Sequence, residues 1–199
     1  MKKAEATIQI HQPNKKELLF FLISGAAVSI PLSILLEQNF ASPLLAGLSA
    51  FDIALLSVAI FTPFIEEFSK VFPLFYRHGE TQKSIFKLAI FVGIGFGIIE
   101  FVTYVSTYGL QIIPARIPGL FFHPASTSIS AYGIATRRPI PLYLAAVALH
   151  FSNNLLAILG PSIVPSSTIV LVIALLTSWQ LYSRTKEKFI ESEHVTCPG

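Results

Sequence analysis

Seven ionisable residues stand inside stretches of the chain that are otherwise strongly apolar. They are Asp52, Glu66, Glu67, Lys70, Glu100, His123 and His150. A charged side chain at the centre of a bilayer costs about 2.5–3.5 kcal/mol, so such residues usually face the interior of a helix bundle and mark function. Carboxylates and imidazoles can move protons between water and a substrate, or hold a metal ion. These residue types are suited to amide hydrolysis.

The spacing of these residues separates the two neighbouring carboxylates. Glu66 and Lys70 are four residues apart, so they share one face of a helix, where opposite charges attract. Glu67 points about 100° away, so the two carboxylates can have different partners. Farther along the chain, His150 and Asn154 share a face one turn apart. A carboxylate can take a proton from water and return it to the leaving amine, while an imidazole and an amide polarise the carbonyl.

The composition argues against an ordinary soluble domain. The 199 residues are 53% hydrophobic and 13% charged, with a mean hydropathy of +0.66, whereas a soluble domain carries about 25% charged residues. A single cysteine, Cys197, argues against a disulfide framework or a cysteine-based zinc site. The expected fold is all-α, a polytopic membrane helix bundle.

Six segments approach the length of about 20 apolar residues that a membrane-spanning helix needs. They run over residues 18–36, 44–75, 85–108, 117–135, 142–159 and 169–182. Pro63 and Pro73 argue against an uninterrupted helix in the second segment. The fourth segment is rich in Ser and Thr over 126–130, so an irregular or re-entrant segment is the alternative to a full crossing there. We expect about six transmembrane helices.

The distribution of Lys and Arg predicts that both termini are cytoplasmic. With the N-terminus inside, twelve Lys and Arg residues fall in inner segments and only Arg116 falls in an outer loop. This split follows the positive-inside rule, and an odd number of crossings would place a basic cluster outside. We therefore expect a transmembrane domain over 18–182 and cytoplasmic tails at 1–17 and 183–199, in the plasma membrane of a prokaryote. The same bias explains the pI near 9.0, so no nucleic-acid binding is inferred.

Four of the ionisable residues are predicted to lie at one level of the membrane. They are Glu66, Glu100, His123 and His150. Counted along each helix from the nearest inner basic residue, at about 1.5 Å per residue, their depths are all roughly 16–21 Å. Asp52 lies near the outer surface by the same count and is excluded from the site. We expect the four to line one polar cavity, open to the cytoplasmic half of the bundle.

The order of these residues resembles that of a known family. Glu66-Glu67-x-x-Lys70, then Phe96-x-x-x-Glu100 in a glycine-rich span, then His123, then His150, resemble the PrsW family of intramembrane proteases over roughly residues 60–160. His150-x-x-x-Asn154 also resembles the last motif of the related CAAX-protease and bacteriocin-processing (CPBP) superfamily. The CAAX-type first motif ends in an arginine instead of a lysine, and this difference favours PrsW. Within the glycine-rich span, Gly93-x-x-x-Gly97 is a small-residue face that lets another helix approach closely.

The resemblance implies an endopeptidase that cleaves a membrane-anchored protein or peptide at the lipid bilayer. Carried over residue by residue, its catalytic residues are Glu66, Glu67, Glu100, His123, His150 and Asn154. Glu66 or Glu67 would activate water with His150, while His123 and Asn154 would position the carbonyl. Glu100 would support them, and Lys70 would be a charge partner.

The resemblance is compatible with a metalloprotease and with a glutamate protease that uses no metal. It also leaves open whether Glu66 or Glu67 is the general base. A metal, if used, would be zinc held by Glu67, His123 and His150, since zinc suits these ligands.

Two alternatives to a protease fit the same residues. Buried Glu, His and Lys also form the proton relays of ion-coupled transporters, although the chain lacks the internal repeat that many carriers have. A catalytically inactive scaffold that binds transmembrane helices could keep the full set of residues. The oligomeric state and the substrate are left open.

Overall fold

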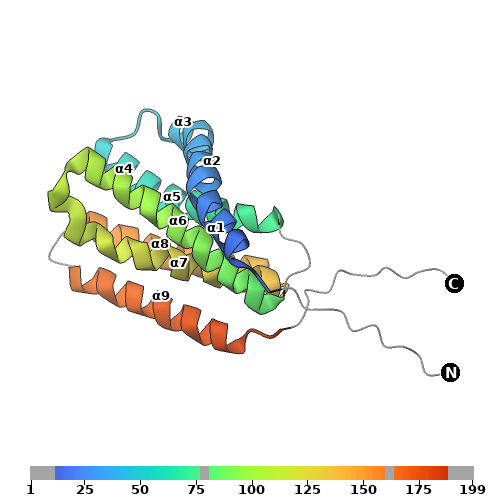
Figure 1. Cartoon of the computed structure of the whole chain (residues 1–199). Helices are drawn as coiled ribbons and strands as arrows, with labels where there is room; N and C mark the ends of the chain where they lie inside the picture. The colour runs from blue at the N-terminus through green and yellow to red at the C-terminus, as the bar shows by residue number, and fades with distance from the viewer. Residues whose placement is uncertain (1–11, 77–80, 160–163, 188–199) are drawn as a thin grey trace, which may run out of the picture.

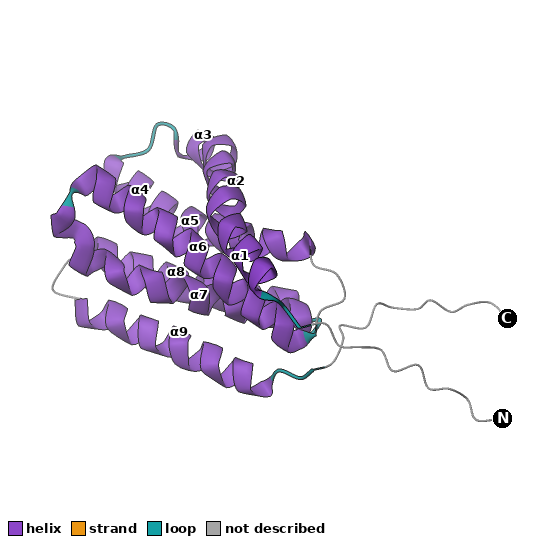
Figure 2. Cartoon of the chain, in the orientation of Figure 1, coloured by secondary structure: helices purple, strands orange, loops and turns teal. Residues whose placement is uncertain are grey.

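The computed structural model describes residues 12–76, 81–159 and 164–187, and this part of the chain is helical with no strand (Figure 2). The predicted all-α membrane helix bundle is confirmed. Much of both predicted tails, including Cys197, lies outside the described residues, as does Arg77, which the depth count used for the second segment.

The first two predicted segments each form a helical stack in which the type of helix changes. The first stack is α1 (Lys15–Ser24), η1 (Gly25–Ser29), α2 (Ile30–Leu36), η2 (Glu37–Ala41) and α3 (Ser42–Leu45). The second stack is α4 (Ala50–Ala54), η3 (Leu55–Phe61), α5 (Thr62–Val71) and η4 (Phe72–Tyr76). Pro63 lies in the first turn of α5, after the π-helical η3, and Pro73 lies in the 3-10 turns of η4. The predicted interruptions are therefore changes of helix type, not loops.

The remaining segments form long helices that run back and forth. They are α6 (Gln82–Tyr108), the 3-10 turn η5 (Leu110–Ile112), α7 (Ile113–Ala135), α8 (Pro139–Leu159) and α9 (Val164–Arg184). In Figure 1, α6, α7 and α8 lie side by side, with α1 against α6 and with α9 against α7 and α8. The predicted site residues Glu100, His123 and His150 therefore come from helices in the middle of the bundle.

The fourth predicted span, α7, is a continuous helix and not an irregular segment. Its hydroxyl-rich stretch is buried among neighbouring helices, and the hydroxyls of Ser126, Thr127 and Ser128 donate to backbone carbonyls one turn earlier. Such bonds satisfy polar side chains inside an apolar environment. The helix also passes through Pro118 and Pro124 without a break.

Three helical stretches of the described chain are long and apolar enough to cross a membrane. They are Lys15–Leu45, Gln82–Tyr108 and Pro139–Leu159, and the apolar part of α9, Thr168–Arg184, is shorter. The protein is therefore a membrane protein. Its other helical segments pack against these three.

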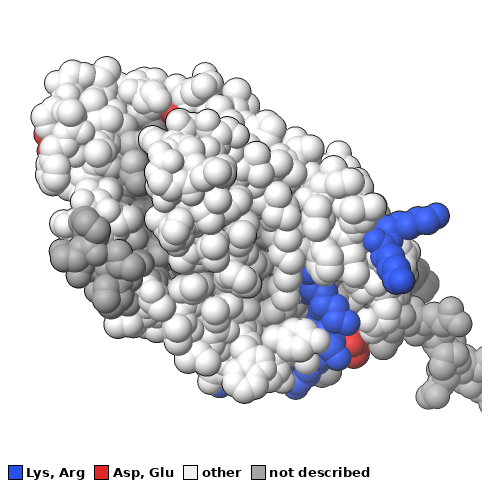
Figure 3. Space-filling view, turned by 60° about the vertical axis from the view of Figure 1, so that its left-hand side comes forward, with Lys and Arg blue, Asp and Glu red and all other residues white. Residues whose placement is uncertain are grey.

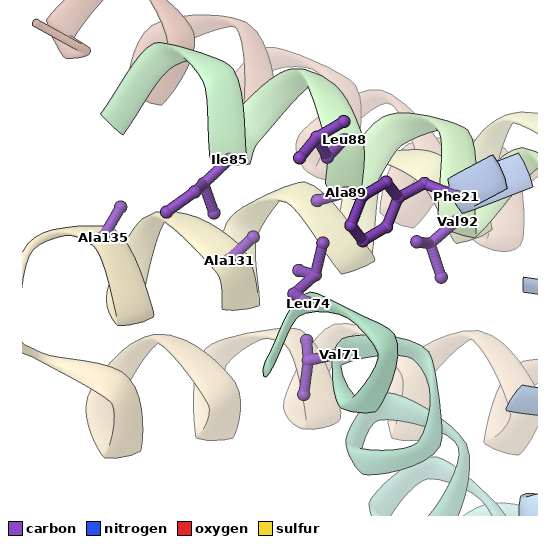
Figure 4. Packing of buried hydrophobic residues seen from close by; sticks show 9 residues of the cluster. All are labelled: Phe21, Val71, Leu74, Ile85, Leu88, Ala89, Val92, Ala131 and Ala135. Carbon is purple, nitrogen blue, oxygen red and sulfur yellow. The ribbon is translucent and has the colours of Figure 1, made fainter. Parts of the chain in front are cut away.

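Close backbone contacts hold the central helices together. A buried apolar cluster joins α1, α5, η4, α6 and α7 (Figure 4). A Cβ added at Gly95 would lie 1.9 Å from the carbonyl oxygen of Leu22, and one at Gly93 would lie 2.4 Å from Cα of Pro124. Only glycine permits backbones to approach so closely. The predicted small-residue face of α6 is confirmed, and its neighbour is α7.

Lys and Arg side chains gather at one end of the bundle, which we call the basic end (Figure 3). It holds the start of α6, the α7–α8 connection and the end of α9, and the α6–α7 connection forms the opposite, far end. At the basic end, the carboxylate of Glu187 accepts hydrogen bonds from Gln12 and Thr81 at 3.0 Å each and pairs with Lys83 at 3.4 Å. Burial opposes ionisation of Glu187, but these contacts outweigh it and lower the pKa of this carboxyl.

Candidate active site

Six of the predicted residues meet between four helices in the middle of the bundle. Helix α5 carries Glu66, Glu67 and Lys70, α6 carries Glu100, α7 carries His123, and α8 carries His150. The common level that was predicted for residues from four separate segments therefore corresponds to direct contacts, which follow pair by pair.

The ammonium of Lys70 is fully buried and has three acceptors. It lies 2.6 Å from Oε1 of Glu67, 3.2 Å from Nδ1 of His123 and 3.2 Å from Oγ of Ser126. An ammonium has three N–H donors, so each donor has one partner. The ring of Phe96 covers it at 5.2 Å. Lys70 is therefore a fully coordinated internal cation.

The partner of Lys70 differs from the predicted one. The four-residue spacing predicted that Lys70 pairs with Glu66, whereas in the structure Lys70 forms its ion pair with Glu67, three residues away. Both spacings share a helix face, and tertiary packing decides between them, because the Glu67 side of α5 faces α7 and α8. Ser126 was not among the predicted site residues, although its position three residues after His123 places both on one face of α7.

The contacts of the two histidines define which nitrogen carries the proton. Lys70 donates to Nδ1 of His123, so the Nε2–H of that ring donates to the carboxylate of Glu100. Nδ1 of His150 lies 2.9 Å from Oε1 of Glu67 and donates to it. The Nε2 atom of His150 then carries no proton, and it lies 3.7 Å from Oε2 of Glu66, beyond hydrogen-bond range.

A cavity of about 270 Å³ opens on one side of this cluster. Its lining includes Glu100, His123 and His150, and it extends past Tyr104 and Arg116 towards the far end. The cavity therefore does not open at the basic end, which the sequence predicts to be the cytoplasmic half. On that side the cluster is closed by side chains with at most 1% exposure, namely Lys70, Phe96 and Ser126.

Asn154 lines the cavity but contacts a different element. Its Nδ2 donates to the carbonyl of Val58 at 2.9 Å, and the amide of Asn153 lies beside it. Each amide nitrogen has two N–H groups, so Asn154 retains one for a ligand in the cavity. Asp52, which was excluded from the site, instead accepts a hydrogen bond from Ser49 at the start of α4.

The predicted metal ligands do not fit a metal ion in this arrangement. The ammonium of Lys70 lies between Glu67 and His123, where the ion would be, and it would repel a second cation. Nδ1 of His150 is already bonded to Glu67. Over residues 12–76, 81–159 and 164–187, no three His, Cys, Asp or Glu side chains are grouped as metal ligands.

One comparison with known proteins gives a match. The family model described as "PrsW family intramembrane metalloprotease" matches residues 13–179, a span that contains the whole cluster and its cavity. The curated proteins and the solved structures contain no match to this chain.

Proposed function

The chain belongs to the PrsW family of intramembrane metalloproteases, and on this premise we propose that the buried cluster hydrolyses a peptide bond of a membrane-anchored protein or peptide with water activated by His150 and Glu66. The hydrogen bond between Nδ1 of His150 and Glu67 carries the proposal, because it leaves Nε2 free to accept a proton at the cavity wall. A carboxylate holds the basic histidine of hydrolytic triads in the same way.

The first step is attack of water on the substrate carbonyl. Nε2 of His150 takes a proton from the water, and the water oxygen forms the new bond to the carbonyl carbon. The carboxylate of Glu66 faces this nitrogen and accepts the second water proton in a hydrogen bond, which directs the lone pair to the carbon. The imidazolium that forms is stabilised by Glu67, and Lys70 keeps Glu67 ionised.

The second step is cleavage of the C–N bond. The proton on His150 passes to the leaving nitrogen, the bond breaks, and the tetrahedral oxyanion becomes a carboxylic acid. The oxyanion is stabilised by the remaining N–H of Asn154 and by Nε2–H of His123, which turns from Glu100 to the substrate. The proposal thus makes Glu66 the water-facing carboxylate and Glu67 the orienting one.

The family description includes a metal, but the donor arrangement does not fit one and no step of this reaction uses it. The buried positive charge in the cluster is the ammonium of Lys70. Zinc at Glu67, His123 and His150 would require displacement of that ammonium.

We further propose that the domain over 18–182 crosses a prokaryotic plasma membrane with both tails in the cytoplasm. The basic end then faces the cytoplasm, as the positive-inside rule requires. Because the cavity extends to the far end, the substrate peptide would enter from the outer side of the membrane.

The test uses the full-length protein in phosphatidylcholine vesicles that contain randomised, acyl-anchored peptides, with the products read by mass spectrometry. The wild type is expected to cut, and the His150→Gln variant to cut at least about 100-fold more slowly. Asp52→Asn is the matched control, since this carboxylate lies outside the cluster. Absence of cutting by the wild type, or equal cutting by His150→Gln, would overturn the proposal.

A further inference from the structure

Arg116 is the only Lys or Arg at the far end of the described chain, and it faces the cavity. Its guanidinium carbon lies 3.3 Å from the ring centre of Tyr104, which also lines the cavity. Among the described residues it has no hydrogen-bond or ion-pair partner. The hydrolytic reaction does not use it. A guanidinium with unpaired N–H donors at the wall of a substrate cavity can bind a ligand that carries acceptor atoms.

The chemistry of this group selects the ligand. A guanidinium presents its N–H donors along its edges, and they match the two oxygens of a carboxylate. Stacking on the face of Tyr104 fixes the guanidinium plane and leaves those edges available. Arg116 shares the cavity with Glu100 and His150, so its position favours a group of the peptide in the cavity over a lipid phosphate on the outer surface.

The helix register gives the distance to the cleaved bond. Arg116 precedes His123 by seven residues, which is two turns on the same face of α7 and about 10 Å along its axis. On the opposite wall, Tyr104 follows Glu100 by one turn of α6. An extended peptide advances about 3.3 Å per residue. A side chain that reaches Arg116 therefore belongs to a residue about three positions from the scissile bond.

We propose that Arg116, held on Tyr104, forms a specificity subsite for an acidic substrate residue about three positions from the cleaved bond. The subsite rests on the proposed protease function. It fixes the register of the peptide, because an acidic residue bound there places one particular carbonyl against His150 and Glu66.

The experiment uses acyl-anchored peptides with amidated C-termini that carry one Asp, or one Asn, at each position in turn. The wild type is expected to cut one Asp peptide with kcat/KM at least about tenfold above that of the matching Asn peptide. A ratio of this size corresponds to the free energy of one hydrogen bond to a charged group. This ratio is expected to fall to near one in Arg116→Gln, mainly through KM. In Arg116→Glu, a Lys at the same position is expected to replace Asp as the preferred residue. The ratio is expected to be unchanged in Arg184→Gln, a control at the basic end.

Three outcomes would overturn the subsite. They are a wild type without preference for Asp at any position, a preference that persists in Arg116→Gln, and an Arg116 effect that appears only when the vesicles contain anionic phosphatidylglycerol. The last outcome would assign Arg116 to lipid headgroups.

A binding measurement separates failure of the subsite from failure of the protease function. Fluorescence anisotropy compares the Asp and Asn peptides on full-length His150→Gln, where no cleavage is needed. Tighter binding of the Asp peptide that depends on Arg116 supports the subsite, and equal binding overturns it.

Discussion

Glu66 and Glu67 are neighbours in the chain, but they end on different sides of the same cluster. Glu67 has no exposed surface, and one of its oxygens contacts both Lys70 and His150. The side chain of Glu66 is 13% exposed. Oε2 of Glu66 and Oε2 of Glu67 are both buried without a hydrogen-bond partner among the described residues. We therefore call the Glu67 side of the cluster, which is unexposed and paired with Lys70, the sealed side, and the partly exposed Glu66 side the open side.

The difference between the two glutamates follows from helix geometry. Successive residues on a helix are turned by about 100°, so two adjacent carboxylates on α5 cannot face the same neighbours. The sealed carboxylate has an internal cation and fixes the orientation of His150. Each carboxylate keeps one buried oxygen without a partner, which costs stability, but only Glu67 is in contact with the ammonium of Lys70. Function and stability are thus divided between identical side chains one residue apart.

The largest expected effect is on turnover, and it tests the open side. Glu66→Gln keeps the shape of the side chain but removes the carboxyl group that orients water, so cleavage is expected to fall about 10²–10⁴-fold. The free energy of unfolding is expected to change by less than about 1 kcal/mol, because no buried pair is broken. Initial rates in vesicles and unfolding in detergent micelles measure the two quantities. If unfolding shifts as much as turnover, the two sides are not distinct.

The next effect is on stability, and it tests the sealed side. Lys70→Met leaves the carboxylate of Glu67 buried without its cation, which is expected to cost about 3–5 kcal/mol. The double variant Glu67→Gln/Lys70→Met removes both charges and is expected to recover most of that loss. Chemical unfolding followed by circular dichroism measures it, with Lys87→Met at the basic end as the control. A single variant as stable as the control would show that Lys70 does not neutralise Glu67.

The shared level of the cluster could be predicted because helix rise is constant. Glu66, Glu100, His123 and His150 were placed together from residue counts alone. In the structure His123 contacts Glu100, His150 lies beside Glu66, and the two imidazole rings are 5.7 Å apart. Composition gave the all-α bundle for a similar reason, since apolar stretches of about 20 residues cross a bilayer as helices, which satisfy their own backbone hydrogen bonds. Close packing of α6 against α7 also followed from Gly93 and Gly97.

What depended on tertiary packing could not be predicted. Two glutamates precede Lys70, Glu67 by three residues and Glu66 by four, and both spacings allow an ion pair on a helix. Only the position of α7 decides that Lys70 pairs with Glu67. The side on which the cavity opens depends on which side chains close the other side, and no residue count contains that information. Asn154 lies at the expected face, but its bond to Val58 depends on how η3 packs against α8.

A smaller effect is expected where α6 and α7 meet beside both sides of the cluster. In Gly93→Ala, the new Cβ would lie 2.4 Å from Cα of Pro124 and 2.7 Å from the carbonyl oxygen of His123, so the helices must separate. Overpacking of this kind costs about 1–3 kcal/mol. Gly119→Ala is the matched control, because its Cβ would meet nothing closer than 3.8 Å. Thermal unfolding compares the two variants, and equal melting temperatures would contradict the close packing.

The smallest expected effect is the response to metal removal, and it asks whether the sealed side needs any cation besides Lys70. The ammonium already neutralises Glu67 and occupies the space between Glu67 and His123. Treatment with 1,10-phenanthroline is therefore expected to change the initial rate by less than about twofold, whereas an enzyme whose metal activates water would lose most of its activity. The non-chelating 1,7-isomer is the control for direct binding of the reagent. A loss that only the chelating isomer causes, and that added zinc restores, would mean that Lys70 moves aside for a metal and that the sealed side is not fixed.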